Sequence, residues 1–289
     1  MIVIANGRLS AAINPLGAEL WSLKDAAGAE WMTDADPAFW TGHAPILFPI
    51  VGALNRGRYR LGGREYAMGK HGFARTSRFE VASQAADSAE FRLVDSAETQ
   101  AVYPFAFELT VRFALAGEAL TLTAAIANTG DQPLPFSFGF HPAFAWPLPR
   151  GGDKHGHAIV FDQDEAQDVA RIDAAGLIAR SEPSPVVGKR LALDEPLFID
   201  DALIWTELAS RGCRYVSPGG AELRLRWPES PMLGVWQKPG ARYICIEPWQ
   251  GHADPAGFTG GFTQKPGSVT LAPGASRAWS LEIAVHPAR

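Results

Sequence analysis

The chain has 289 residues and a formal net charge of −5, with 47% hydrophobic and 20% charged residues. A chain of this length can bury a substantial core, and its composition is that of an ordinary globular protein. The acidic balance and the lack of any run of Lys or Arg argue against a surface that binds nucleic acid or anionic membranes.

The first local signal is a capped short turn at Asp36–Trp40. Beyond it, most of the chain alternates polar and apolar residues with the period of two that is typical of half-buried strands. Arg58–Leu61 and Arg64–Ala67 flank two glycines, which predicts a β-hairpin. Glu108–Leu115 and Ala119–Ile126 flank a three-residue turn and predict another. Further strands are expected at Arg78–Ala82, Ala89–Val94, Ala158–Phe161, Glu222–Trp227, Met232–Trp236, Tyr243–Ile246, Ser268–Leu271 and Ala278–Val285.

Helical signals are weak, and 29 glycines and 22 prolines make turns frequent. The stretch Pro147–Pro196 is rich in Pro, Gly and charge, but its apolar islands indicate an ordered, loop-rich insertion instead of a linker. No domain boundary is visible. We therefore predict an all-β protein, a large antiparallel β-sandwich with few short helices, formed by a single domain over residues 1–289.

The chain shows no membrane or export signal. No segment approaches the ~20 apolar residues of a membrane span, and the N-terminal residues lack a signal-peptide pattern. The two cysteines are Cys213 and Cys245. Few cysteines without an export signal are typical of a reducing cytoplasm, so we expect a cytoplasmic protein with free thiols. A disulfide between the two is the less favoured alternative.

Two histidines stand beside residues that bend or end a strand. His71 is followed by Gly72, and Arg75 places a cation nearby, which favours a neutral imidazole suited to hydrogen bonding. His141 follows an apolar, strand-like run and precedes Pro142, so we place it at a strand end among aromatic residues. The alternatives are a loop histidine for the first and a satisfied core histidine for the second.

Glu247 is the single residue that most strongly indicates a functional site. It directly follows the apolar strand Tyr243–Ile246, and Pro248 is expected to end that strand. A bare buried carboxylate costs several kcal/mol, so Glu247 must be solvated, paired or used. Trp249 could form an aromatic wall beside it. A histidine and a carboxylate in one pocket can move two protons near neutral pH.

Weaker candidates complete the set. Asp201 precedes a short apolar strand, where a simple turn is the alternative. Arg56 could donate two hydrogen bonds to vicinal hydroxyls or a phosphate, although a surface arginine is the default. The pair His155-x-His157 lies in a charged, glycine-rich loop without a cysteine partner, so we expect no metal site. Glycine-rich phosphate-binding loops and the Gly-x-Ser-x-Gly motif are absent, so we expect no nucleotide cofactor and no serine-hydrolase chemistry.

Five motifs together resemble the aldose 1-epimerase (galactose mutarotase-like) family, in its order and approximate spacing and over nearly the whole chain. The His-Gly-Phe-Ala-Arg and Ile-Glu-Pro-Trp forms are most similar to the LacX-like bacterial branch. The motifs are Phe48-Pro49-Ile50-Val51-Gly52, His71-Gly72-Phe73-Ala74-Arg75, Gly139-Phe140-His141-Pro142, Asp201-Ala202-Leu203 and Cys245-Ile246-Glu247-Pro248-Trp249.

The resemblance implies a large antiparallel β-sandwich that interconverts the α and β anomers of an aldose without a metal or redox cofactor. It implies that Glu247 removes the proton of the C1 hydroxyl and that His141 protonates the ring oxygen. The residues His71 and Asp201 would then bind hydroxyls. One position departs from the family, because Ala53 stands where members often carry an arginine.

We expect Arg56, together with Arg75, to replace that arginine in binding the substrate, and Trp249 to line the site. The expected partner is a monosaccharide, and we expect a monomer or homodimer. One alternative is a hexose-6-phosphate mutarotase that holds the phosphate with Arg56, Arg75 or Lys70. A second is a non-catalytic carbohydrate-binding or sensor protein, and a third is a different enzyme on a related sandwich.

Overall fold

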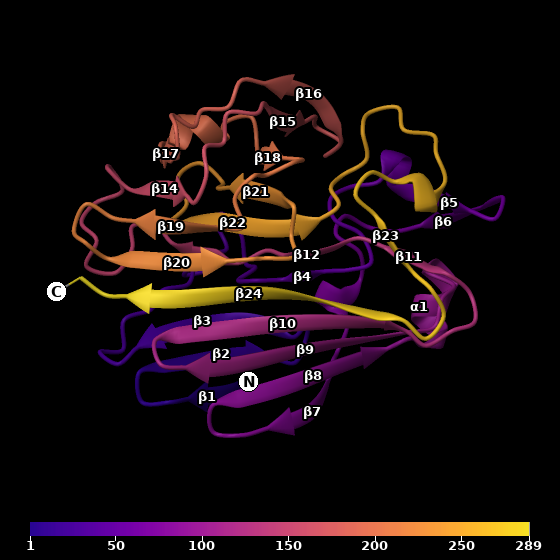
Figure 1. The fold of residues 1–289 in the computed structure, drawn as a ribbon, viewed down its shortest axis with the longest axis horizontal. Helices are drawn as coiled ribbons and strands as arrows, with labels where there is room; N and C mark the ends of the chain where they lie inside the picture. Colours follow the sequence, from indigo (N-terminus) through magenta and orange to yellow (C-terminus); the bar gives the residue numbers. More distant parts are fainter. Residues whose placement is uncertain (289) are drawn as a thin grey trace.

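The computed structural model describes residues 1–288 and consists mainly of antiparallel strands (Figure 1). The larger sheet has nine strands. In spatial order they are β17 (Arg190–Ala192), β14 (Ala158–Phe161), β19 (Gly212–Val216), β20 (Glu222–Arg226), β24 (Ser276–His286), β10 (Ala119–Asn128), β9 (Phe107–Ala116), β8 (Ser88–Val94) and β7 (Glu80–Gln84).

A second large sheet has eight strands and carries the residues of interest. In spatial order they are β16 (Ile178–Glu182), β15 (Val169–Ile172), β18 (Leu203–Trp205), β21 (Met232–Trp236), β22 (Tyr243–Gln250), β12 (Phe138–Phe140) and β4 (Ile46–Leu47), and β13 (Ala143–Ala145) also pairs with β22. Every strand pair in the two sheets is antiparallel.

Smaller elements surround these sheets. The helical segments within residues 1–288 are short, and none is long and apolar enough to cross a membrane. The remaining strands are β1 (Ile2–Ala5), β2 (Leu9–Asn14), β3 (Glu19–Asp25), β5 (Arg58–Leu61), β6 (Arg64–Ala67), β11 (Leu134–Phe136) and β23 (Val269–Leu271), and the helices are α1 (Ala97–Val102) and the 3₁₀ turns η1 (Asn55–Gly57), η2 (Ala74–Thr76), η3 (Glu195–Phe198) and η4 (Phe262–Gln264).

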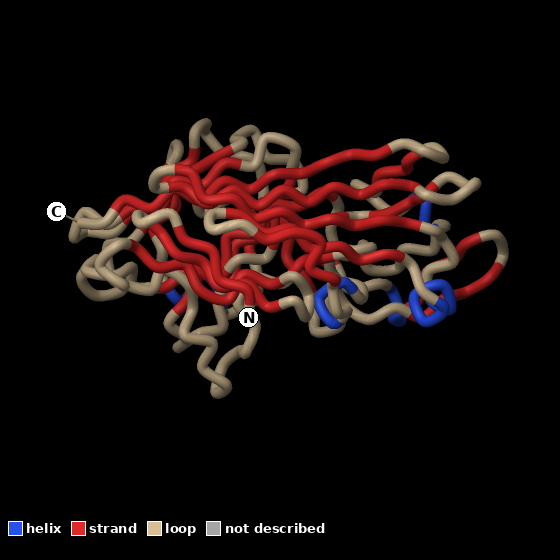
Figure 2. Tube along the Cα trace, turned by 90° about the horizontal axis from the view of Figure 1, so that it is seen from below, coloured by secondary structure: helices blue, strands red, loops and turns tan. Residues whose placement is uncertain are grey.

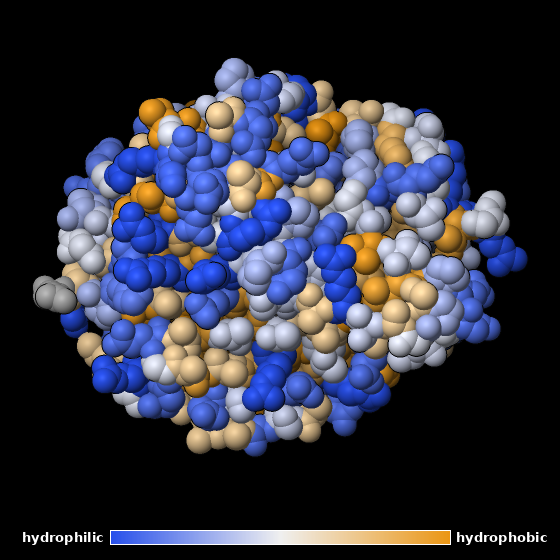
Figure 3. Space-filling view, in the orientation of Figure 1, coloured by the Kyte–Doolittle hydropathy of each residue, from blue (hydrophilic) through white to orange (hydrophobic). Residues whose placement is uncertain are grey.

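The core lies between the two large sheets, whose strands run in stacked layers (Figure 2). Strand β10 illustrates how one face of a sheet is buried in this core, because its residues alternate between buried and half-buried along its whole length. Aromatic rings join the layers, since Phe138 of one sheet lies 5.5 Å from Trp279 of the other, centroid to centroid. On the face shown in Figure 3 hydrophilic residues predominate, as expected for the outside of such a sandwich.

The predicted all-β sandwich is confirmed. Strands β5, β6, β14 and β21 have the predicted bounds, and β9 and β10 form the predicted hairpin with slightly longer strands. The segment Pro147–Pro196 is ordered and contributes strands to both large sheets. The turn at Asp36–Trp40 is also present, since the Asp36 side chain accepts a hydrogen bond from the Ala38 amide.

The expectation that Pro248 ends its strand is wrong. Strand β22 continues to Gln250, and Glu247 lies in its interior, paired with Gly234 of β21. On the other side of β22 the neighbour changes from β13 to β12, because His141 and Pro142 separate those two strands. This break leaves the ladder unpaired beside Pro248, so its missing N–H is tolerated there.

A tight backbone contact fixes the loop that carries His71. Gly72 has φ +72°, and a Cβ added there would lie 2.2 Å from the carbonyl oxygen of Phe48. His71 itself has a left-handed φ of 70°. The loop can therefore lie against the end of β4 only because residue 72 has no side chain.

We expect Gly72→Ala to destabilise the protein by more than the conformational penalty alone. Gly63→Ala is the matched control, since Gly63 has a similar φ of +78° but nothing near its missing Cβ. The control should lose about 1–2 kcal/mol, the ordinary cost of a left-handed alanine. Urea unfolding measures the loss of stability in both variants. Equal losses would show that the close contact with Phe48 does not contribute to the effect of Gly72→Ala.

Candidate active site

A cavity of about 290 Å³ lies on the face of the eight-stranded sheet that points away from the core. Four neighbouring strands, β15, β18, β21 and β22, supply its floor, and loops supply its rim. The functional residues predicted from sequence meet here, except for Arg56. The cavity is lined by Trp40, Gly52, Lys70, His71, Arg75, His141, Ile172, Gly176, Asp201, Ala202, Ile204, Trp236, Glu247, Trp249 and Ala253.

Glu247 and His141 form the centre of the cavity. Glu247 Oε2 lies 3.1 Å from His141 Nε2, and the two side chains are only 2% and 9% exposed. The contact lacks the alignment of a hydrogen bond, since Glu247 Oε2 has no hydrogen-bond partner within residues 1–288. The two side chains are therefore in close contact without an aligned hydrogen bond.

Burial sets the protonation state of this pair. It raises the pKa of Glu247 well above its ordinary value, an effect that Asp201 adds to and Lys70 opposes. It also lowers the pKa of His141 to about 3. Both shifts favour the neutral forms, a carboxylic acid on Glu247 and an uncharged imidazole on His141. Ordinary pKa values would instead leave the carboxylate ionised and the imidazole partly protonated.

Trp249 lies flat against the sheet beside the pair. A Cβ at Gly139 or at Gly234 would lie 2.5 Å from its indole ring. The glycines of two strands, β12 and β21, thus leave the space that the Trp249 ring occupies. On the other side, Trp40 and Trp236 surround His141 at centroid distances of 5.1 and 6.1 Å.

His71 is held as a neutral imidazole. Its Nδ1 accepts a hydrogen bond of 3.1 Å from the Gly52 amide, which leaves Nε2–H as the available donor. Its pKa lies well below the ordinary value, first because of burial and then because of His141, Lys70 and Arg75. The neutral state predicted from sequence thus has burial as its main cause, with Arg75 contributing less.

The rim carries the charged residues. Asp201 has a left-handed φ of 67°, and its Oδ1 accepts a hydrogen bond from the Ala202 amide. The buried Arg171 supports this loop by donating to the carbonyls of Asp201 and Ala202. Within residues 1–288, Lys70 and Arg75 form no ion pair, so both cations are available to a ligand.

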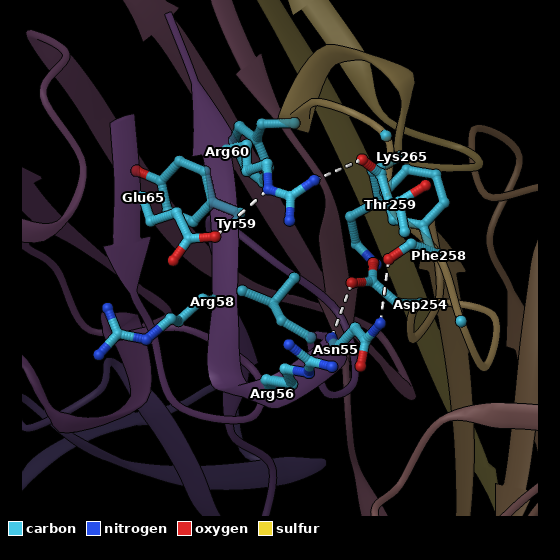
Figure 4. A pocket seen from close by; sticks show the side chains of 14 residues that line it. Asn55, Arg56, Arg58, Tyr59, Arg60, Glu65, Asp254, Phe258, Thr259 and Lys265 are labelled. Atoms are coloured by element: carbon cyan, nitrogen blue, oxygen red, sulfur yellow. Dashed lines mark hydrogen bonds and ion pairs between the residues drawn. The ribbon is translucent and has the colours of Figure 1, made fainter. Parts of the chain in front are cut away.

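Arg56 lines a separate cavity of about 490 Å³ between the β5–β6 hairpin and the loop that follows β22 (Figure 4). A polar wall divides the two cavities. In it, the Asp254 amide donates to Ala53 O at 2.9 Å, and the Asp254 carboxylate accepts from the Asn55 amide and from Lys265. The structure therefore does not bring Arg56 to the position beside Ala53 where a substrate-binding arginine was expected.

Sequence reasoning missed several residues of the site. The sequence pattern predicts Trp40 only as part of a turn and Trp236 only as the end of a strand. Both cysteines are free thiols, as predicted, and both are buried. The fold nevertheless groups one donor atom each of His141, Cys245 and Glu247 within 4.8 Å of one another, a set that could hold a metal ion. No local spacing could reveal that set, because His141 is distant in sequence.

The buried His71 should make stability fall with acid. Its folded pKa is depressed, so below about pH 6.5 the unfolded chain binds a proton that the folded chain does not. Each pH unit below that point should cost about 1.4 kcal/mol, and stability should return as pH rises. Urea unfolding at pH 5 to 8 should show a shallower pH dependence for His71→Asn. The same slope in His71→Asn and in the exposed-site control His155→Asn would contradict this account.

Comparisons with known proteins agree with this geometry. Protein LacX (chromosomal) of Lactococcus lactis subsp. lactis is 32% identical over 261 residues, covering 86% of this chain and 87% of that protein. A galactose mutarotase related enzyme from Lactobacillus acidophilus has a TM-score of 0.92 at 32% identity, covering 99% of this chain and 97% of that one. A galactose mutarotase-like protein from Lactobacillus casei also has a TM-score of 0.92, at 30% identity, covering 99% and 100%. The family model for aldose 1-epimerase matches residues 1–284, and the chain belongs to that family.

Proposed function

We propose that the protein is an aldose 1-epimerase that interconverts the α and β anomers of a monosaccharide. The observation that carries this proposal is the contact of 3.1 Å between Glu247 and His141 at the centre of a small cavity. Its volume is near the lower end of the roughly 300–1,000 Å³ of small-molecule sites, which suits one sugar ring. Since lining residues come from positions 40 to 253, we also propose that the whole chain acts as one catalytic unit.

Ring opening needs one transferable proton on the pair. Burial favours a state with that number, in which Glu247 is protonated and His141 is uncharged. Transfer of that proton from Glu247 to His141 creates a carboxylate base and an imidazolium acid. The carboxylate then removes the proton of the C1 hydroxyl while His141 protonates the ring oxygen. The C1–O5 bond breaks to give the open-chain aldehyde, rotation about C1–C2 exposes the other face, and both proton transfers reverse on closure.

Polar and aromatic groups around the pair would bind the sugar. His71 can donate through Nε2 to a hydroxyl, and Asp201 can accept from one. Trp249 and Trp236 offer flat apolar surfaces, on which the C–H face of a pyranose packs. Lys70 opposes the burial effect on Glu247, so it favours the ionised base that the reaction requires.

A phosphorylated hexose is the second candidate. It is favoured by Lys70 and Arg75, two cations on the rim that lack a carboxylate partner within residues 1–288. A phosphate at C6 would supply that partner. A non-catalytic sugar binder needs neither cation nor the proton-carrying pair, so the site favours it less.

We expect Glu247→Gln to slow anomer exchange by roughly 10²–10⁴-fold, because the amide cannot take the C1 proton. Saturation-transfer NMR on a panel of free sugars gives the rate directly. Glu165→Gln is the matched control: Glu165 is also fully buried, but it lies outside the cavity and accepts from the amides of Ala209 and Ser210. An unchanged rate in a folded Glu247→Gln protein would contradict the proposed catalytic role of Glu247.

The sugar and its phosphate can be told apart with Arg75→Ala. If the substrate is a sugar 6-phosphate, loss of one charge-assisted hydrogen bond should raise KM for glucose 6-phosphate about tenfold or more. The KM for free glucose should change little, and Arg78→Ala, three residues along and outside the cavity, serves as the control. A wild-type enzyme that exchanges glucose as efficiently as its 6-phosphate would rule out the phosphate reading.

A further inference from the structure

The three donors His141, Cys245 and Glu247 form a cluster that the proposed reaction uses only in part. Cys245 and Glu247 are two residues apart on β22, so their side chains leave the same face of the sheet. One donor atom each of these residues and of His141 lie within 4.8 Å of one another. The cluster offers one nitrogen, one sulfur and one oxygen.

This donor set suits a borderline-soft divalent cation such as Zn²⁺ or Cd²⁺. Bonds of about 2.0–2.3 Å to tetrahedral zinc place ligand atoms roughly 3.3–3.7 Å apart. The distance of 3.1 Å between Glu247 Oε2 and His141 Nε2 is slightly shorter than that spacing, and donor atoms that lie up to 4.8 Å apart need to approach by about 1 Å. The cavity provides the fourth position for a water molecule.

None of the three donors is committed elsewhere. Glu247 Oε2 lacks a hydrogen-bond partner within residues 1–288, His141 Nε2 contacts that oxygen, and Cys245 is a free thiol. A dication bound to the thiolate and the carboxylate leaves a site with no net charge, which removes the cost of burying two anions. Lys70 and Arg75 on the rim weaken this attraction without occupying a ligand position.

We propose that His141, Cys245 and Glu247 form an inhibitory site for a thiophilic divalent cation. The bound ion would occupy the two proton-carrying groups, so metal and sugar would compete for one cavity. The inhibitory part rests on the proposed function, whereas the binding part does not. Cys245 is the residue that makes the site selective, because without its sulfur only a histidine and a carboxylate remain.

The test is a titration of the full-length protein with Cd²⁺, read by the ultraviolet charge-transfer band of the cadmium–thiolate bond. We expect the band in the wild type and in Cys213→Ala, since Cys213 is equally buried but lies in β19 of the nine-stranded sheet and is not part of the cluster. Cys245→Ala should lack it. Cys245→Ser should also lack the band. Because serine keeps the size of the side chain, this variant gives the answer even if alanine disturbs the packing of β22.

Anomer exchange in the presence of Zn²⁺ gives the second readout. We expect Zn²⁺ to inhibit the wild type and Cys213→Ala, with activity restored by EDTA and protection by excess sugar. The zinc concentration for half inhibition should rise about tenfold or more in Cys245→Ser, compared with that variant's own zinc-free rate. A cadmium band without any anomer exchange by metal-free protein would leave the site standing and reject the proposed function. No band in an active wild type, or a band that survives both Cys245 substitutions, would overturn the metal site.

Discussion

The contact between Glu247 and His141 is the constraint on which the rest of the site depends. It places a carboxyl and an imidazole side by side in a nearly dry environment, where neither charge is favourable alone. Burial favours the neutral form of each group, a carboxylic acid on Glu247 beside an uncharged imidazole on His141. One proton transfer separates this state from the charged pair that the proposed ring opening would use.

The backbone around the pair explains how such a site can exist inside a sheet. A residue in the middle of an interior strand is normally paired through its backbone with strands on both sides. Here β12 and β13 are separate strands, and His141 and Pro142 fill the gap between them. The same break tolerates Pro248 and brings His141 to Glu247. Gly139 and Gly234 then allow Trp249 to lie flat on the sheet, which gives the cavity one wall.

The rim depends on a second group of contacts. His71 reaches the cavity because Gly72 packs against the carbonyl of Phe48, and the Gly52 amide sets its tautomer. Arg171 supports the loop of Asp201 through carbonyl oxygens. These interactions involve backbone groups, so they define the position of the ligand-facing atoms without adding competing side chains. Lys70 and Arg75 remain unpaired within residues 1–288, which leaves positive charge for the ligand.

The sequence by itself determined the sandwich and most members of the site. Period-two patterns at positions such as 58–67 and 108–126 depend on local alternation, which the structure keeps. The motifs around His71, His141 and Glu247 were recognisable because each sits beside a Gly or Pro. Only the tertiary structure decided that Glu247 lies within a strand, that Arg56 belongs to another cavity, and that Cys245 lies beside Glu247 and His141. Those features arise from a broken ladder and from side chains of distant strands, and local pattern carries no information about either.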